Sequence, residues 1–256
     1  MKQRLGAVSI IKVAIVCLVM HVCHGIPLCY DEADGTVLKF PTGLEGPMAE
    51  VRFAHRFYGS IDDDPEDNFL GLFTGTNVLA GVRFIVLDKL DLTADYIWNN
   101  REYLLGTGYT FNVSQVPLSF YAGASLDSYN AGNREYGPFL TGSASFGFAE
   151  ARIIPAANIL YDGIDEIPAL GLGLNASILE PLAFIGEYYI PLKDIDSPLS
   201  NHNSFILGLI IRTYGHHFHL TVSNSQAHSP RAVMKGSPSN DLHFGFIIKR
   251  LISIGE

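Results

Sequence analysis

Apolar and polar residues alternate one by one over long stretches of this chain, and this pattern restricts the fold more than any other feature. Side chains on a strand point to opposite faces in turn, so a period of two predicts a strand with one apolar and one polar face. The clearest stretch sets an apolar face against a mostly polar one: Leu90, Leu92, Ala94, Tyr96 and Trp98 against Asp91, Thr93, Asp95 and Ile97. About twelve such segments follow one another after residue 48, an even number typical of bacterial membrane barrels.

The connections between these segments alternate in length. Short connections near residues 88, 115, 151, 180 and 215 are separated by mostly longer ones, with the short turn at 99–101 as the exception. The sequence therefore predicts an all-β fold, a single antiparallel up-and-down transmembrane β-barrel of about twelve strands. In such barrels the short turns face the periplasm, so we expect both termini there. A soluble secreted β-sandwich is the minor alternative.

The first residues have the character of an export signal. Lys2, Arg4 and Lys12 precede the short apolar run Val13–Met20, which is too short to span a bilayer. We expect a signal peptide over residues 1–25, cleaved after Gly25. A lipoprotein anchor is the less favoured alternative.

Two further segments complete the predicted organisation. Residues 26–47 are rich in proline, glycine and acids and are predicted to form a leader, either periplasmic or plugging the lumen, before a barrel over 48–256. After cleavage only Cys29 would remain, which excludes an internal disulfide.

The amino-acid composition restricts the kinds of molecule that this chain can bind. Charged residues make up 17% of the chain and hydrophobic ones 48%, which suits strands in contact with lipid. The net charge of −9 and the lack of a Lys/Arg cluster argue against nucleic acid. We expect outer-membrane lipid as the surroundings, a small solute in the lumen and no cofactor, with no protein partner identified.

Three segments resemble an uncharacterised family of bacterial β-barrel proteins, classed as a domain of unknown function. They are Glu50–Phe57, Gly186–Tyr189 and Gly215–Gln226, and the resemblance extends from about residue 48 to about 250. It implies a bacterial outer-membrane barrel and brings no known activity.

Charged side chains on the predicted polar faces are the main functional candidates. They are Arg52, Arg56, Arg83, Asp95, Glu187 and Arg212. Asp95 is expected across the tight turn from Gly81, diagonal to Arg83, where it could pair with that arginine. In an open lumen these charges would set the selectivity of a pore, and in a filled one they would form a structural network.

No catalytic residue is predicted. His219, Ser223 and Asn224 are the types used in lipid hydrolysis, but four residues along a strand separate His219 from Ser223 by roughly 13 Å. That distance is too long for proton transfer.

Metal binding is weakly indicated at two places, and no metal site is predicted. His217 and His219 share one strand face, but a site usually needs a third ligand. Asp62, Asp63 and Asp64 offer oxygen ligands without the spacing of a calcium loop.

These features leave three functional hypotheses. The first is a small passive channel or solute-binding barrel, motivated by the charged polar face. The second is a structural barrel that docks a protein partner through its outer loops or leader. A membrane-embedded lipid hydrolase is the third and least favoured, so we expect no enzyme.

Overall fold

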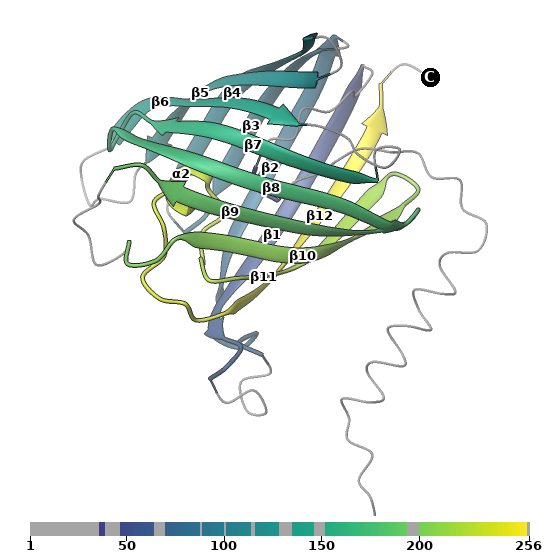
Figure 1. The fold of residues 1–256 in the computed structure, drawn as a ribbon. Helices are drawn as coiled ribbons and strands as arrows, with labels where there is room; N and C mark the ends of the chain where they lie inside the picture. Colours follow the sequence, from purple (N-terminus) through teal and green to yellow (C-terminus); the bar gives the residue numbers. More distant parts are fainter. Residues whose placement is uncertain are drawn as a thin grey trace, which may run out of the picture.

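A computed structural model shows a closed barrel of antiparallel strands (Figure 1). It describes residues 36–38, 47–63, 70–87, 89–99, 101–113, 116–127, 135–145, 152–193 and 200–254. The twelve strands are β1 (Met48–Ser60), β2 (Thr76–Leu87), β3 (Leu90–Ile97), β4 (Glu102–Val113), β5 (Val116–Asp127), β6 (Glu135–Ser145), β7 (Ile153–Asp162), β8 (Ile167–Leu179), β9 (Leu182–Pro191), β10 (Ser204–Thr213), β11 (His216–Ser223) and β12 (His243–Ser253). The predicted twelve-stranded all-β barrel is confirmed.

Each strand pairs with its neighbours in sequence, and β1 closes the ring by pairing with β12. The register places Arg52 opposite Gly81 on β2 and opposite Lys249 on β12. Short connections join β2 to β3, β4 to β5, β8 to β9 and β10 to β11 at one end of the barrel, as predicted. The predicted turn near residue 151 lies outside the described residues. The described loop residues at the opposite end include 61–63, 70–75, 200–203 and 224–242.

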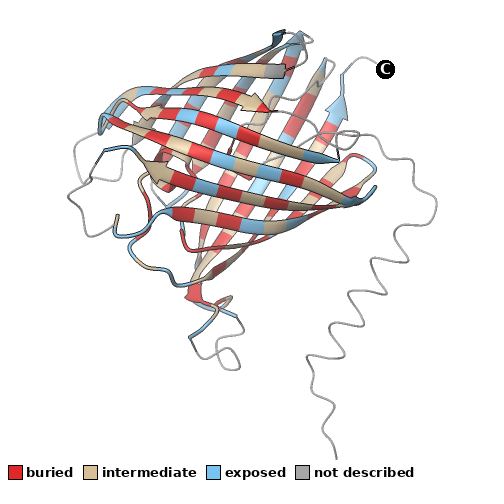
Figure 2. Cartoon of the chain, viewed as in Figure 1, coloured by how far each residue is buried: buried red, intermediate tan, exposed pale blue. Residues whose placement is uncertain are grey.

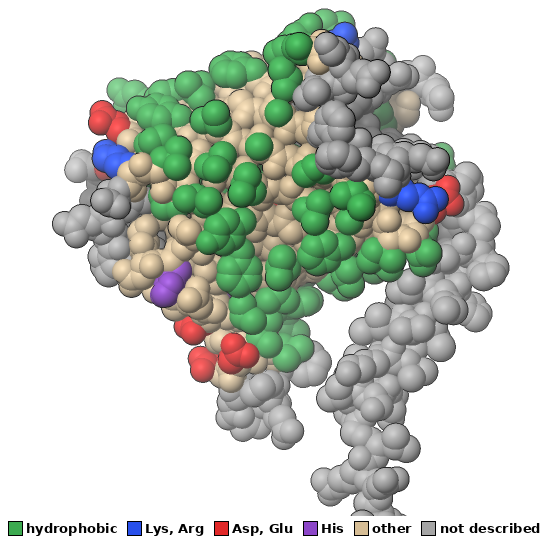
Figure 3. Space-filling view, viewed as in Figure 1, with side chains coloured by type: hydrophobic (Ala, Val, Ile, Leu, Met, Phe, Trp, Pro, Cys, Tyr) green, Lys and Arg blue, Asp and Glu red, His purple; other side chains and the backbone are tan. Residues whose placement is uncertain are grey.

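The outer face of the barrel is apolar. Burial alternates residue by residue along the strands (Figure 2), and the side chains that point outward form a broad hydrophobic surface (Figure 3). Exposed members include Phe53, Phe84, Leu92, Leu105, Phe120, Ile159, Leu172, Leu207 and Leu220. Aromatic rings meet near the strand ends, as Tyr96 and Trp98 do at 5.0 Å between centroids. This surface suits contact with lipid hydrocarbon, and the aromatic rings suit the girdles at its edges.

No helix among the described residues is long and apolar enough to cross a membrane. The helix α2 (Pro230–Val233) lies within the ring of strands (Figure 1). It belongs to the connection between β11 and β12, residues 224–242, which we call the inserted loop. Its Ser229, Val233 and Met234 are completely buried.

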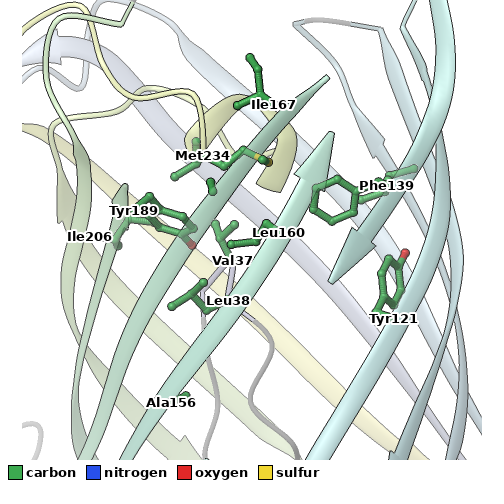
Figure 4. Close-up of a cluster of buried hydrophobic side chains, with 13 residues drawn as sticks. Val37, Leu38, Tyr121, Phe139, Ala156, Leu160, Ile167, Tyr189, Ile206 and Met234 are labelled. Carbon is green, nitrogen blue, oxygen red and sulfur yellow. The ribbon is translucent and has the colours of Figure 1, made fainter. Parts of the chain in front are cut away.

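A second stretch of chain also lies inside the barrel. Thr36, Val37 and Leu38, which we call the leader segment, are buried against the inner wall. Val37 and Leu38 belong to an apolar cluster that also contains Val233 and Met234 of the inserted loop (Figure 4). The wall completes this cluster with Leu104, Tyr121, Phe139, Ala156, Leu160, Ile167, Ala169, Tyr189 and Ile206.

The remaining N-terminal predictions lie outside the described residues. They comprise the signal peptide over 1–25, Cys29 and most of the leader over 26–47. Asp64 of the acidic loop also lies outside.

Candidate functional site

All six predicted lumen charges lie on the inward-facing side of their strands. Arg52 and Arg56 come from β1, Arg83 from β2, Asp95 from β3, and Glu187 and Arg212 from β9 and β10. Arg56, Glu187, Arg212 and Asp95 are almost completely buried. The alternation that defines the strands therefore also places these side chains in the lumen.

The expected pair of Arg83 with Asp95 is wrong. Asp95 instead pairs with Arg52, whose Nε donates to its Oδ1 at 3.0 Å. Arg83 donates to Asp91 at 3.1 Å. The predicted register of Asp95 opposite Gly81 holds, but the long Arg52 side chain reaches across β2 to the carboxylate.

Gly81 makes this reach possible. It lies between Arg52 on β1 and Asp95 on β3 in the strand register. A Cβ at this position would overlap the Asp95 carboxylate and lie 2.9 Å from Arg52 Nε. The absence of a side chain on the middle strand lets two charges two strands apart form a direct ion pair.

One end of the inserted loop is held by Arg56. Its Nη1 donates to the carbonyl oxygens of Ser225 at 3.1 Å and Ala227 at 2.5 Å. Asn77 on β2 donates from Nδ2 to the carbonyl oxygen of Gln226 at 3.1 Å. These bonds satisfy loop backbone that would otherwise be buried without partners.

The middle of the inserted loop, at Arg231 and Lys235, is held by an ion-pair cluster. Arg231 Nε donates to both oxygens of Asp162 at 3.1 and 2.9 Å, and its Nη2 donates to Asp165 at 3.0 Å. Lys235 lies 3.1 Å from Asp162 and also pairs with Asp165. Burial alone would raise the pKa of Asp165, but the hydrogen bond and charge of Lys235, with Arg231, hold it below its ordinary 3.8.

Sequence reasoning missed this cluster. Asp162 is not among the predicted lumen charges, yet it is the last residue of β7 and is completely buried. The helix in the inserted loop was not predicted, although Ser229-Pro230-Arg231 followed by Ala-Val-Met is a helix-start signal with an apolar face. Glu102 was missed as well, and it accepts hydrogen bonds from Ser125 at 2.7 Å and Ser229 at 2.9 Å.

Glu187 holds the leader segment. Its carboxylate accepts hydrogen bonds from the backbone N–H groups of Thr36 at 2.5 Å, Val37 at 3.2 Å and Leu38 at 3.3 Å. The Tyr189 hydroxyl donates to the same carboxylate at 2.7 Å. The carboxylate is thus surrounded by donors, as a buried charge requires.

The inner wall as a whole carries nearly balanced charge. Its buried or half-buried cations are Arg52, Arg56, Arg83, Arg212 and Lys249, and its anions are Glu50, Asp91, Asp95, Glu102, Asp162 and Glu187. Arg231 and Lys235 of the inserted loop add two cations, so among the described residues seven cations lie near six anions. The lumen therefore has no strong field of one sign.

The described residues enclose a small cavity in the lumen and a larger hollow near the loops. A cavity of about 30 Å³, room for about one water molecule, lies beside Thr36, Arg52, Asp95, Tyr121 and His228. A polar hollow of about 300 Å³ lies near the loops, lined by residues that include Tyr58, Asp63, Asn224, Gln226, Asp241 and His243. The inserted loop and the leader segment occupy the space between the walls.

The weaker candidates take structural positions. Ser223 Oγ donates to the carbonyl oxygen of Phe205 at 2.6 Å, and Asn224 Nδ2 donates to the carbonyl oxygen of Asn203 at 2.9 Å. His217 and His219 face the lumen from β11, and Asp62 and Asp63 follow β1. The described residues contain no group of three His, Cys, Asp or Glu side chains placed to hold a metal ion.

Fold and inner wall together define a membrane-bound β-barrel. A family model described as a membrane bound beta barrel domain (DUF5777) matches residues 159–252. The predicted resemblance to an uncharacterised barrel family is thereby confirmed, while the Glu50–Phe57 segment lies outside the matched range. No curated protein matches the chain significantly.

Solved structures show the same fold. A KdgM porin in complex with disordered oligogalacturonate is similar with a TM-score of 0.52 and 12% identity, over 80% of this chain and 99% of that one. Another KdgM porin structure has a TM-score of 0.49 and 12% identity, over 81% of this chain and 99% of that one. The Acinetobacter baumannii outer membrane protein Omp33 has a TM-score of 0.48 and 9% sequence identity, over 81% of this chain and 99% of that one. At these identities the likeness concerns the fold alone.

Gly81→Ala should destabilise the barrel by about 1–3 kcal/mol, because the added methyl group separates Arg52 from Asp95. Urea unfolding of the refolded protein, followed by the fluorescence of the single Trp98, measures this change. Gly142→Ala is the matched control, because a Cβ there meets nothing within 4 Å. Equal stability of the two variants would contradict the role of Gly81.

Acid should lower the stability of the folded protein, because His228 of the inserted loop is buried in its neutral form. Burial, with the charge of Arg56, lowers the pKa of His228 well below its ordinary 6.5, and its Nε2 has no hydrogen-bond partner among the described residues. The folded state thus favours neutral His228, so this stability is complete above about pH 6.5 and is lost as the pH falls toward the lowered pKa.

Unfolding midpoints between pH 7.5 and pH 5 test this expectation. The decrease should be smaller by about 1 kcal/mol in His228→Gln than in the unmodified protein. His202→Gln, at an exposed loop histidine, should behave like the unmodified protein. A decrease unaffected by His228→Gln would refute the assignment.

Proposed function

We propose that the protein is an outer-membrane channel for small polar solutes, closed at rest by the inserted loop. The observation that carries this proposal is the lumen itself: a polar, charge-balanced inner wall filled by a loop that side chains hold in place. The termini are then periplasmic, since the short turns lie at the end where β1 begins.

The way the inserted loop is held supports reversible closure. Backbone pairing closes the barrel wall along every strand. The inserted loop makes a backbone bridge from Ser237 to His202, and its other contacts include the side chains of Arg56, Asn77 and Glu102 and the Asp162–Arg231 pair. Side-chain contacts can be exchanged for water without opening the sheet. The loop can therefore leave the lumen while the barrel stays intact.

The balanced inner wall indicates the solute class. With seven cations near six anions among the described residues, the lumen neither concentrates nor repels ions of one sign strongly. The KdgM porin with oligogalacturonate illustrates a barrel of this fold in complex with a saccharide. For this chain we expect polar solutes of little net charge.

Arg231→Gln should increase the open fraction of the channel more than tenfold. The substitution removes the bonds from Arg231 to Asp162 and Asp165, and breaking a buried pair costs about 3–5 kcal/mol. Planar-bilayer recording of the refolded full chain measures open fraction and conductance. Lys193→Gln, at an exposed lysine, is the control and should leave both unchanged.

A variant in which a short Gly-Ser linker replaces residues 226–236 provides the second test. If the proposal holds, the barrel with this shortened loop conducts ions continuously and shows only a weak preference between anions and cations. Retention of the folded barrel is checked by heat-dependent migration in gels. A folded barrel with the shortened loop and no conductance would overturn the channel function.

A further inference from the structure

We propose that the inner wall around Glu187 is a peptide-binding site whose resident ligand is the leader segment, and that this segment and the inserted loop stabilise each other in the lumen. The chemical class of ligand is a bent peptide backbone that presents successive N–H groups on one side and carries two adjacent apolar side chains. This inference concerns how the lumen is filled and does not depend on conduction.

The polar half of the site recognises backbone. Three successive N–H groups, from Thr36, Val37 and Leu38, converge on the Glu187 carboxylate at distances between 2.5 and 3.3 Å. Convergent backbone N–H groups are a recurring way to bind an anion. Here the anion belongs to the wall and the N–H groups to the ligand. Tyr189 orients the carboxylate by donating to Oε2 at 2.7 Å.

The apolar half of the site selects side chains. Val37 and Leu38 lie among Leu160, Tyr189 and Ile206 (Figure 4). Leu38 packs directly against Gly171 on β8. A Cβ at Gly171 would lie 2.5 Å from Leu38 Cδ2, which is too close for a side chain. A glycine at this point of the inner wall leaves space that the leader segment fills.

The same apolar cluster joins the leader segment to the inserted loop. Val233 and Met234 of the loop are completely buried in the cluster that holds Val37 and Leu38. Loss of either partner exposes apolar surface of the other. Coupling between two bound elements is reciprocal, so releasing the loop loosens the leader segment, and the reverse.

Cysteine labelling of the refolded full chain tests the site directly. With Cys17, Cys23 and Cys29 replaced by serine, Thr36→Cys introduces a buried thiol at the site. A membrane-impermeant maleimide should label it slowly. Glu187→Gln, which weakens acceptance of the three N–H groups, and Gly171→Val, which displaces Leu38, should each accelerate labelling at least tenfold.

Gly142→Val provides the matched control and should leave the labelling rate unchanged, because its position is open. Should Glu187→Gln fail to fold, Gly171→Val still tests the site. Equal labelling rates in Gly171→Val and Gly142→Val would overturn the peptide site.

The coupling has its own readout. Arg231→Gln, which loosens the inserted loop, should also accelerate labelling of Thr36→Cys, and Lys193→Gln should not. If Arg231→Gln leaves the labelling rate unchanged, the mutual stabilisation is wrong. Because labelling requires no current, failure of the channel proposal would appear separately, as absent conductance with unchanged labelling behaviour.

Discussion

A charge inside a ring of strands is stable only if it has a partner of opposite sign or hydrogen bonds, which are accepted by an anion and donated by a cation. The outer wall is apolar, so the alternation of faces sends nearly all strand charges inward, where hydration is limited. Arg52 with Asp95 and Arg83 with Asp91 meet this requirement on the wall. Glu187, Asp162 and Arg56 meet it through chain segments that enter the lumen. The inserted loop and leader segment are therefore part of how the barrel accommodates its own charges.

Small residues on the inner wall decide which partners can meet. Gly81 opens the path between Arg52 and Asp95, and Gly171 makes room for Leu38. A larger side chain at Gly81 would separate Arg52 from Asp95 and leave both charges unpaired. A larger side chain at Gly171 would displace Leu38 from its apolar contacts. Glycine weakens a strand interior, so its presence at these points is consistent with a need for close approach.

The alternation of residues was sufficient to predict twelve strands, the outward and inward faces, and the inward position of the six charged side chains. It was not sufficient to predict their pairing. Arg83 and Asp95 are diagonal neighbours, but the longer reach of Arg52 across Gly81 decides the outcome. The ligand of Glu187 was also beyond prediction, because backbone N–H groups leave no trace in the sequence. The inserted loop carried a faint signal at Ser229-Pro230, yet only the closed ring shows that it has a lumen to enter.

The barrel thus combines two kinds of attachment with different consequences. Strands are joined by continuous backbone hydrogen bonds, and separating one pair would expose many polar groups to lipid, so the ring opens only with the whole fold. Besides a backbone bridge at Ser237, the inserted loop and the leader segment are held by ion pairs, amide–carboxylate bonds and one shared apolar cluster. Their release exposes groups to water in the lumen rather than to hydrocarbon, which lowers the cost. Because both segments meet in one cluster, the same few contacts that fill the lumen also link the state of one segment to that of the other.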